Sequence, residues 1–416
     1  MSARGRRRPA TARGKRTVRS LLQAAASAFS EHGYHRTSVA AICRHAELAN
    51  GTFYQYFPNK ESIYLELVAD TSGELLNHLD DSTADGDPVL EQLIDALRAY
   101  WRFIRTHADR HQIMREAEFV RLETSETFYR RLGAFYRSRV ERGQRRGEIA
   151  DVDPDALAYA LIGLSEFVGL RYLIWDHDFA DPVVDAVADL LRHGVDRRRS
   201  RSVGADPAVR RPERAHANGS KAESDATTRS QILAAAEAEF GQSGFHAASV
   251  ADIARRADVA HGTVYRYFPS KEALFADVVR EINRQLRAQI RRQTGDLADR
   301  RAAERAGFRA FFDFIGQHAR MYRVVREAEF VGSARDRVGP WYYHRLAEGY
   351  MHGIQTAVDR GEWRELDAEV IAWSLMGIAH FWGLRWIVWE QTMPPMRVFD
   401  TLDHLLCCGL MPSDRR

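Results

Sequence analysis

Residues 38–60 read S-V-A-A-I-C-R-H-A-E-L-A-N-G-T-F-Y-Q-Y-F-P-N-K, and this stretch decides the fold. Ser38 can cap a short helix whose apolar residues recur at helical spacing. After a tight turn at Glu47, a second helix begins near Asn50 and ends at Pro58, because proline cannot continue a helix. Two short helices joined by a few residues are typical of a helix-turn-helix, whose second helix enters the major groove of DNA.

The second helix of this motif separates apolar from polar side chains. Phe53 and Phe57 lie four residues apart, so we expect them to pack inward. The polar residues are then left for DNA, because hydroxyls and lysine suit phosphate contacts, an amide can read adenine, and glycine lets the backbone approach phosphate. We call this helix-turn-helix the first reader. Its predicted contacts with DNA are Thr37, Ser38, Asn50, Gly51, Thr52, Tyr54, Tyr56 and Lys60.

The chain carries this motif twice. Residues 51–54 (G-T-F-Y) recur as residues 262–265 (G-T-V-Y), and residues 115–120 (R-E-A-E-F-V) recur unchanged as residues 326–331, an offset of 211 (262 minus 51). Further on the offset is 214, which predicts a three-residue insertion between Val331 and Trp341. A repeat of this length is a whole-domain duplication. The predicted contacts of the second reader are Ser249, His261, Gly262, Thr263, Tyr265, Tyr267 and Lys271.

Composition and periodicity fit an all-α protein. The chain has 416 residues, of which 45% are hydrophobic and 28% charged, and no stretch alternates as a strand would. Asp153-Pro154 predicts a helix start and Gly33 predicts a helix end. The expected segments are a basic disordered arm at 1–16, a helix-turn-helix domain at 17–64, a helical effector and dimerisation domain at 65–197, a flexible linker at 198–226, and the second pair of domains at 227–275 and 276–412.

Charge, cysteine content and hydropathy indicate where the protein acts and what its basic segments contact. Basic runs in residues 1–16 and 192–221 suit either arms that contact phosphate or solvated tails, although the net charge is only +3. Three cysteines without a C-x-x-C pair fit a reducing cytoplasm. The apolar stretch 372–389 is interrupted by His380 and Arg385, so it predicts a buried core helix and no membrane span.

The motif resembles a known family. Residues 51–57 followed by Lys60-Glu61, and residues 262–268 followed by Lys271-Glu272, are similar to the N-terminal DNA-binding domain of the tetracycline-repressor (TetR, AcrR-like) family. The resemblance implies a tandem chain in which each copy has a three-helix helix-turn-helix domain and a larger helical domain that binds a small effector and mediates dimerisation.

Two positions depart from the family pattern. Family members commonly have glycine before the turn, where this chain has Glu47 and Asp258. The equivalent of Thr37 in the second copy is Ala248, which lacks a hydroxyl for phosphate, so the second reader can bind more weakly.

The helical domains are where the resemblance places an effector. Arg171 and Arg385 interrupt apolar helices and need partners. Structural ion pairs, of Arg171 with Glu116 or Glu118 and of Arg385 with the equivalent glutamates, are favoured over an anionic ligand head. The dense aromatic residues form either core or pocket. The candidate pocket residues are Arg115, Glu116, Phe119, Phe135, Phe167, Arg171, Arg326, Glu327, Phe330, Tyr350, Phe381 and Arg385.

These features predict a sequence-specific transcriptional regulator, namely a repressor released from double-stranded DNA by a small apolar or amphipathic effector. Helices 154–175 and 368–390 carry glycines that permit close approach, so the copies can pair within one chain as a pseudo-dimer, or two chains can form a homodimer. The alternatives are a regulator with one degenerate reader, a non-specific nucleic-acid binder and a helical-bundle enzyme. His107 and His111 have metal-ligand spacing but no accompanying ligands. We expect a cytoplasmic bacterial protein without cofactor, metal or membrane contact.

Overall fold

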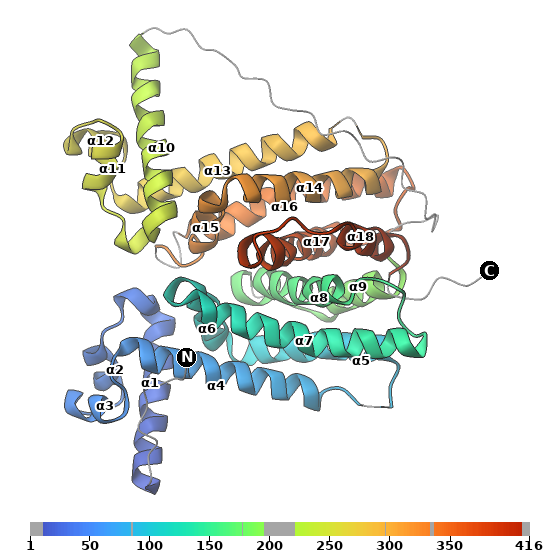
Figure 1. Cartoon of the computed structure of the whole chain (residues 1–416), viewed down its shortest axis with the longest axis horizontal. Helices are drawn as coiled ribbons and strands as arrows, with labels where there is room; N and C mark the ends of the chain where they lie inside the picture. Colours follow the sequence, from blue (N-terminus) through green and yellow to red (C-terminus); the bar gives the residue numbers. More distant parts are fainter. Residues whose placement is uncertain are drawn as a thin grey trace. The chain divides into compact units, whose positions relative to one another are not determined.

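The computed structural model describes residues 11–84, 86–176, 178–194, 221–295, 297–332 and 337–409. Within these ranges the chain is helical and has no strand, as the sequence predicts (Figure 1). Residues 1–10 of the expected basic arm, 198–220 of the expected linker, the three residues 195–197 before it and 333–336 of the expected insertion lie outside the described residues.

The first copy consists of a three-helix domain that contains the helix-turn-helix and a larger helical bundle. The helices are α1 Ala12–Arg36, α2 Val39–His45, α3 Asn50–Tyr56, α4 Lys60–Asp81, α5 Val89–Thr106, α6 Ala108–Val120, α7 Leu122–Arg146, α8 Pro154–Gly169 with its π-helical continuation η1 Leu170–Trp175, and α9 Asp181–His193. Helix α1 begins inside the stretch expected to be a disordered arm, so the basic residues from Arg13 to Arg16 are helical.

The second copy repeats the same order of helices. They are α10 Lys221–Ala247, α11 Val250–Arg256, α12 His261–Tyr267, α13 Lys271–Thr294, α14 Arg300–Gln317, α15 Ala319–Glu327, α16 Val338–Asp359, α17 Ala368–Trp382 with its π-helical continuation η2 Gly383–Trp389, and α18 Met396–Cys408. Helix α10 begins inside the range expected to be linker.

Local sequence chemistry sets several helix ends. Gly33 and Gly244 have φ of 75° and 78°, a left-handed conformation that glycine adopts without a Cβ penalty, and each one breaks the helical path of the first reader helix. Pro154 is the first residue of α8, and the Asp153 carboxylate accepts the N–H of Ala156 at 2.9 Å. Both helix boundaries were expected from the sequence.

The chain forms two compact units, and their boundary does not follow the duplication. Unit 1 contains residues up to Glu148 together with Gly169–Phe179, so it holds α1 to α7 and η1. Unit 2 contains Ile149–Val168 and the chain from Ala180 onward. Helices α8 and α9 of the first copy therefore belong to the same compact body as the whole second copy.

Inside unit 2, α8 and α17 touch at glycines. A Cβ atom added to Gly163 would run into the backbone of Gly377, and one added to Gly377 would run into the backbone of Gly163. The indole Nε1 of Trp382 donates to the carbonyl oxygen of Ala156 at 2.8 Å, and the Asp153 N–H donates to Thr401 Oγ1 at 3.0 Å. These contacts join the last helices of the two copies into one core.

Two helices, Pro154–Trp175 and Ala368–Trp389, are apolar and long enough to cross a membrane by composition alone. In the structure, 94% and 89% of their most apolar windows are buried. The core position accounts for their composition, as the sequence predicted for the second of them.

Candidate DNA-binding interfaces

The first reader presents α3 on a compact base of apolar side chains. Phe53 and Phe57 are 0% and 1% exposed, and their ring centroids lie 5.7 Å apart. Ser38 caps α2, because its Oγ accepts the N–H of Ala41 at 3.1 Å. The expected packing of the two phenylalanines and the expected cap are both present, so α3 is held firmly by its inner face.

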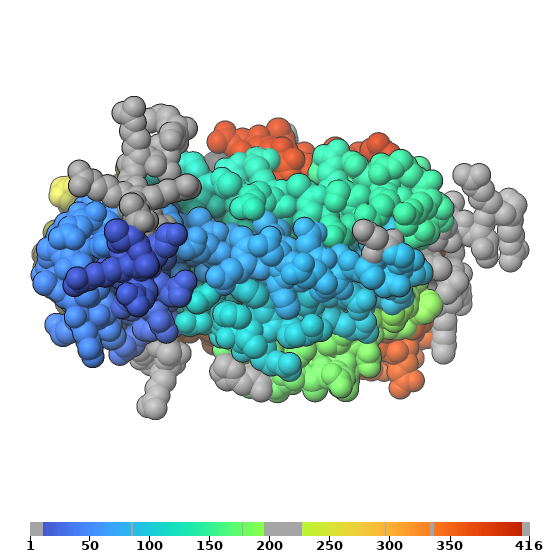
Figure 2. All heavy atoms as spheres, turned by 90° about the horizontal axis from the view of Figure 1, so that it is seen from below, coloured from blue at the N-terminus to red at the C-terminus, as the bar shows by residue number. Residues whose placement is uncertain are grey.

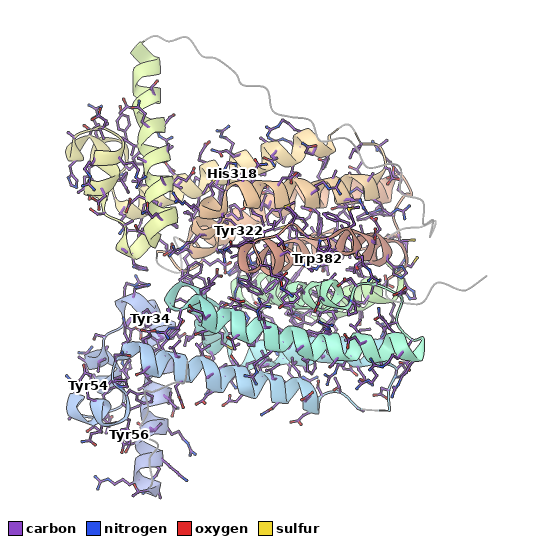
Figure 3. The ribbon with its side chains drawn as sticks, in the orientation of Figure 1. Tyr34, Tyr54, Tyr56, His318, Tyr322 and Trp382 are labelled. Atoms are coloured by element: carbon purple, nitrogen blue, oxygen red, sulfur yellow. The ribbon has the colours of Figure 1, made fainter. Side chains whose placement is uncertain are left out.

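The outer face of α3 carries the polar set. Tyr54 is 58% exposed and, together with Tyr56, extends from α3 at the edge of unit 1 (Figure 3). Asn50 and Gly51 are exposed, and Thr52 and Tyr56 are half-buried. A Cβ atom at Gly51 would meet no atom within 4 Å. Figure 2 shows the side chains of unit 1 from the face on which α1 and α4 lie.

The second reader repeats this arrangement with different side chains. Val264 and Phe268 are each 1% exposed, whereas Tyr265 is 45% exposed and His261 and Gly262 are exposed. Ser249 Oγ accepts the N–H of Ala251 at 3.1 Å and so caps α11. Thr263 and Tyr267 are half-buried.

Neighbouring contacts order the second recognition helix. The His261 and Tyr265 rings lie 5.2 Å apart, and Arg266 Nη2 donates to the Tyr267 hydroxyl at 3.1 Å. The second reader therefore offers an imidazole and a guanidinium where the first offers the amides of Asn50 and Gln55.

Both recognition helices begin without a side-chain cap. The residues preceding them are Ala49 and Ala260, and neither makes a capping hydrogen bond through its side chain. The N–H groups of Thr52 and Thr263 donate to the carbonyl oxygens of Ala49 and Ala260 at 2.9 and 2.8 Å, so it is the two N–H groups before each of them that remain able to donate to an anion such as a DNA phosphate.

The family models match in the region of these two readers. A model described as "Bacterial regulatory proteins, tetR family" matches residues 21–67 and again residues 232–278. The chain belongs to the TetR family. It carries the family's DNA-binding domain twice, and its relatives are helix-turn-helix transcriptional regulators.

Named proteins are similar to single copies of this tandem TetR chain. The uncharacterized regulator YhgD of Bacillus subtilis is 28% identical over 177 residues, which is 41% of this chain and 90% of YhgD. The transcriptional activator FasR of Mycolicibacterium smegmatis is 34% identical over 130 residues, 30% of this chain and 59% of FasR. Among solved structures, a putative fatty acid metabolism regulator of Clostridium perfringens is 22% identical with a TM-score of 0.38, covering 44% of this chain and 98% of that protein.

The turns of both TetR readers adopt a conformation that favours glycine. Glu47 has φ of 55° and Asp258 has φ of 53°. A left-handed conformation costs a residue with a side chain roughly 1–2 kcal/mol. This backbone geometry explains why glycine is the family's common choice here, and it means that both readers of this chain hold a strained turn.

Thr37 is not exposed for the phosphate contact expected from the sequence. The side chain is buried, and its hydroxyl donates to the carbonyl oxygens of Ala28 at 3.0 Å and Gly33 at 2.7 Å. The equivalent Ala248 is also buried. The missing hydroxyl in the second copy therefore removes an internal hydrogen bond and gives no reason for weaker binding by that reader.

Lys60 has a structural role that the sequence analysis missed. Its Nζ donates to the carbonyl oxygens of Tyr34 at 2.6 Å, Thr37 at 2.9 Å and His35 at 3.4 Å, and burial lowers its pKa. The ammonium thus ties the start of α4 to the end of α1. Lys271 donates to the carbonyl oxygen of His246 at 3.4 Å and lies 4.7 Å from the centroid of the Phe245 ring, so fewer carbonyl oxygens hold it than hold Lys60.

A glutamate joins each reader to its helical bundle. In unit 1, both carboxylate oxygens of Glu116 on α6 accept the N–H of Tyr34, at 3.0 and 3.1 Å. In unit 2, Glu327 on α15 accepts the N–H of Phe245 with both oxygens at 3.0 Å. The donating N–H belongs to the residue directly after the left-handed Gly33 or Gly244. The recurring R-E-A-E-F-V segment therefore marks the contact between reader and bundle.

The arginines of the π-helices use carboxylates other than those expected. Arg171 pairs with Asp176 at 2.5 Å and with Asp178 at 3.5 Å, and Arg385 pairs with Glu390. These partners lie a few residues further along the chain, so the arginines close the ends of η1 and η2. The expected partners Glu116 and Glu327 instead bind backbone N–H groups, as described above.

The structure separates the candidate effector residues into core and cavity. Phe167 and Tyr350 line cavities in unit 2, whereas Phe381 is buried in the core. Arg326 is buried, and burial lowers its pKa to about 10. The remaining candidates, Arg115, Phe119 and Phe330, are half-buried, and Phe135 is buried.

Three cavity-lining arginines of unit 2 were missed. Arg287, Arg291 and Arg300 line a cavity of about 300 Å³ between α13, α14 and α16. The sequence holds a signal for them, because the equivalent residues of the first copy, 211 positions earlier, are Leu76, Asp80 and Val89. A change from apolar or acidic residues to arginine at three matched positions indicates a difference in function between the copies.

The histidine pair has an ordinary structural explanation. His111 is 2% exposed and its Nε2 lies 3.3 Å from the Tyr100 hydroxyl, so it is a residue of the core. Within the described residues, no group of three His, Cys, Asp or Glu side chains could hold a metal ion.

Proposed function

We propose that the chain is a cytoplasmic regulator that binds one operator with two unlike readers. The observation that supports this most strongly is the repeated division of α3 and α12 into a buried apolar face and an exposed polar face. Phe53 and Val264 are buried at matched positions, and Tyr54 and Tyr265 are exposed at the next ones. Side chains presented in this way can contact phosphates and base edges together.

We further propose that the two copies act as a pseudo-dimer within one chain. The support is that α8 and α9 of the first copy pack against α17 and α18 of the second inside unit 2, with Gly163 facing Gly377 and Arg364 donating to the Gly194 carbonyl at 3.0 Å. In the DNA-bound state, the recognition helices would enter major grooves about 34–36 Å apart. Because the readers differ in side chains, the half-sites would differ in sequence.

The proposed regulation is repression relieved by a small effector. An effector in the helical domain changes the population of two states, and only one of them fits the operator. The hydrogen bonds that Glu116 accepts from the Tyr34 N–H and Glu327 accepts from the Phe245 N–H would be the route from bundle to reader. The similar protein FasR is named an activator, so the direction of regulation needs its own measurement: an effector that tightened operator binding would contradict relief of repression.

The test is selection of bound sequences from random DNA, followed by affinity measurements with variants. Tyr54→Ala and Tyr265→Ala should each lower operator affinity about tenfold or more, because each removes a stacking surface and a hydroxyl from an exposed position. Trp341→Ala is the matched control, since this exposed aromatic residue lies on α16, away from the recognition helices. All three proteins should unfold at the same urea concentration.

The selected sequences distinguish the rival functions. One pseudopalindrome or two unlike half-sites would support two active readers in one chain. Loss of affinity on Tyr54→Ala alone would indicate a degenerate second reader. Binding that is equal for random and selected DNA would overturn the proposal and favour non-specific binding through the basic segments.

A further inference from the structure

The helical bundle of the second copy contains a cavity between α13, α14 and α16. Its cavity of about 300 Å³ adjoins a smaller apolar cavity of about 40 Å³, and both are lined by Ile290, Leu346 and Tyr350. Gly349, on the wall of the larger cavity, is exposed to solvent. A cavity of this size that opens to solvent is large enough to hold a small organic molecule.

The equivalent region of the first copy is filled by its own side chains. The offsets of 211 and 214 residues place Gln92, Phe135 and Arg139 where the second copy has Ala303, Gly349 and Gly353. Gln92 is 1% exposed and Phe135 is 9% exposed. The first copy therefore has a carboxamide, a phenyl ring and a guanidinium at positions where the second copy has a methyl group and two hydrogen atoms.

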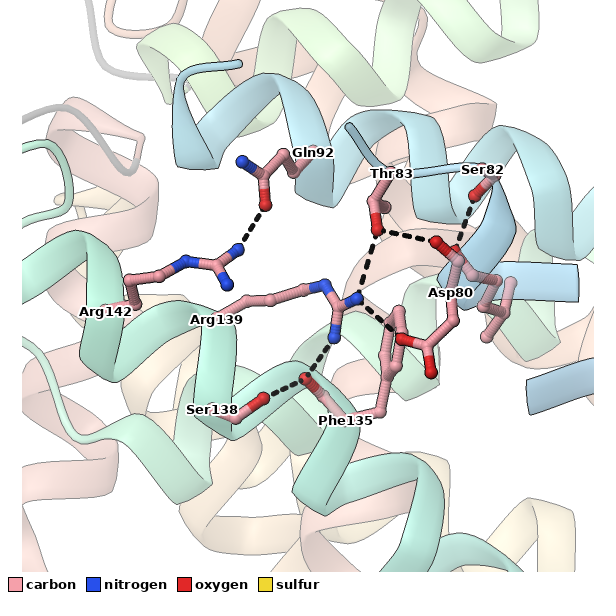
Figure 4. Close-up of polar contacts among 9 residues, drawn as sticks. Asp80, Ser82, Thr83, Gln92, Phe135, Ser138, Arg139 and Arg142 are labelled. Atoms are coloured by element: carbon pink, nitrogen blue, oxygen red, sulfur yellow. Dashed lines mark hydrogen bonds and ion pairs between the residues drawn. The ribbon is translucent and has the colours of Figure 1, made fainter. Parts of the chain in front are cut away.

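A polar network holds the filling side chains in place (Figure 4). Arg139 donates to Asp80 at 2.8 Å, to Thr83 Oγ1 at 3.0 Å and to the Phe135 carbonyl at 3.2 Å. Its guanidinium carbon lies 3.6 Å from the centroid of the Phe135 ring, and Arg142 donates to Gln92. Displacing these groups would break several hydrogen bonds at once, so they oppose the entry of a ligand into this region of the first copy.

One of the two glycines of the second copy, Gly349, leaves the corresponding space open. A Cβ atom at Gly349 would meet no atom within 4 Å. Gly353 is covered by the guanidinium of Arg300, which reaches across from α14 and pairs with the buried Glu304. Arg300 thus forms a fixed wall of the cavity, while the space beside Gly349 stays empty.

The charge of the cavity favours an anion. Arg287 and Arg291 lie one turn apart on α13 and both line the cavity. No ion pair of either side chain occurs within the described part of the chain, whereas Arg300 is already paired with Glu304. The first copy has Leu76 and Asp80 at the matched positions. Two guanidinium groups that form no ion pair among the described residues are a suitable site for a carboxylate or phosphate, and Glu348, the carboxylate that acts on Arg287, is already paired with Arg345.

The inner cavity connects the ligand site to the first copy. Phe167 of α8 belongs to the first copy but lines this cavity, with its ring 5.3 Å from Tyr343 and 5.0 Å from His380. Apart from Phe167, the lining comes from the second copy. A ligand that enters this space would press on α8, and α8 continues directly into η1.

We propose that the second copy alone binds the effector, and that the effector is an amphipathic anion whose acidic head pairs with Arg287 and Arg291 while its apolar part lies against Ile290, Leu346 and Tyr350. The first copy is a filled counterpart that responds through Phe167. This proposal rests on the proposed function. It adds that the effector site lies in one copy and that one bound ligand per chain produces the response.

Calorimetric titration of the full chain tests this with three probes that share a tail. Decanoate and decyl phosphate carry two kinds of anionic head, and decanol carries none. We expect at least one of the two anions to bind at one site per chain and at least about tenfold more tightly than decanol, since charge-assisted hydrogen bonds add to the same apolar burial. The preferred head then distinguishes a carboxylate from a phosphate source.

Variants locate the site. Gly349→Phe introduces the side chain that Phe135 has at the matched position of the first copy, and no atom obstructs its Cβ. It should lower the affinity for all three probes at least about tenfold. The double variant Arg287→Ala, Arg291→Ala should lower the affinity for the two anions by a similar factor. Its affinity for decanol should stay within about threefold of that of the unchanged chain. Arg284→Ala is the matched control on the same helix, because Arg284 pairs with Glu281 and does not line the cavity. Ala303→Gln is the second filling variant should Gly349→Phe unfold.

Several outcomes would overturn the inference. These are two equal sites per chain, binding by neither anion up to its solubility limit, unchanged affinity in both filling variants, or equal affinity for decanol and the anions. Operator binding by the unliganded chain is measured separately. A chain that binds one anion but no specific DNA refutes the proposed function and leaves the site standing, whereas a chain with a specific operator and two ligand sites refutes only the inference.

Discussion

Replacing Glu327 by alanine should loosen the second reader from its bundle, and replacing it by glutamine should not. Glu327 is 5% exposed, and both of its oxygens accept the buried N–H of Phe245 at 3.0 Å. Alanine leaves this N–H without an acceptor, which costs roughly 1–3 kcal/mol. Burial raises the pKa of Glu327 even though the Phe245 N–H, Arg323 and Lys271 all lower it, so the cost of desolvating the carboxylate exceeds their contribution.

Glutamine keeps an acceptor oxygen and avoids that desolvation cost. We therefore expect Glu327→Gln to change the free energy of unfolding by less than about 0.5 kcal/mol, and Glu327→Ala to lower it by about 1–2 kcal/mol. The assay is urea unfolding combined with hydrogen exchange of peptides that contain Phe245. Exchange at Phe245 should quicken in the alanine variant and stay slow in the glutamine variant.

The first copy provides an internal repeat of this experiment. Glu116 makes the same pair of hydrogen bonds to Tyr34, at 3.0 and 3.1 Å, so Glu116→Ala should quicken exchange at Tyr34 in the same way. Equal effects of alanine and glutamine, or unchanged exchange in both alanine variants, would refute the assignment of these carboxylates as the link between reader and bundle.

Three further predictions concern stability. Glu47→Gly and Asp258→Gly should each raise the free energy of unfolding by up to about 1 kcal/mol, because relief of the left-handed φ of 55° or 53° exceeds the entropy cost of glycine; a fall in the urea midpoint of both would contradict this. Gly163→Leu should lower the stability of unit 2 by about 2 kcal/mol or more, since its side chain would force α8 from the backbone of Gly377, and unchanged thermal unfolding would argue against that contact. Burial and the neighbouring Glu281 raise the pKa of the half-buried Glu237 to about 7, so the folded chain holds this proton more tightly than the unfolded one, and its contribution should be lost as pH rises from about 4.5 to about 7. After allowance for solvent screening the loss is about 1 kcal/mol, and Glu237→Gln should abolish it when urea midpoints are compared across that pH range.

The sequence alone determined the parts of this protein that depend on neighbouring residues. Helical spacing put Phe53 and Phe57 inside and Tyr54 outside, Pro154 and Gly33 set helix ends, and the offset of 211 residues revealed the duplication. Each of these follows from backbone geometry within one or two helical turns, so no knowledge of distant residues was needed.

Partners across the fold were decided only by tertiary structure. Periodicity shows which face of a helix is buried but not which side chain lies opposite, so Arg171 was matched to Glu116 when its partners are Asp176 and Asp178. The same limit hid the burial of Thr37 and the hollow beside Gly349. A cavity exists only where several helices meet, because its volume is set by side chains from elements far apart in the chain.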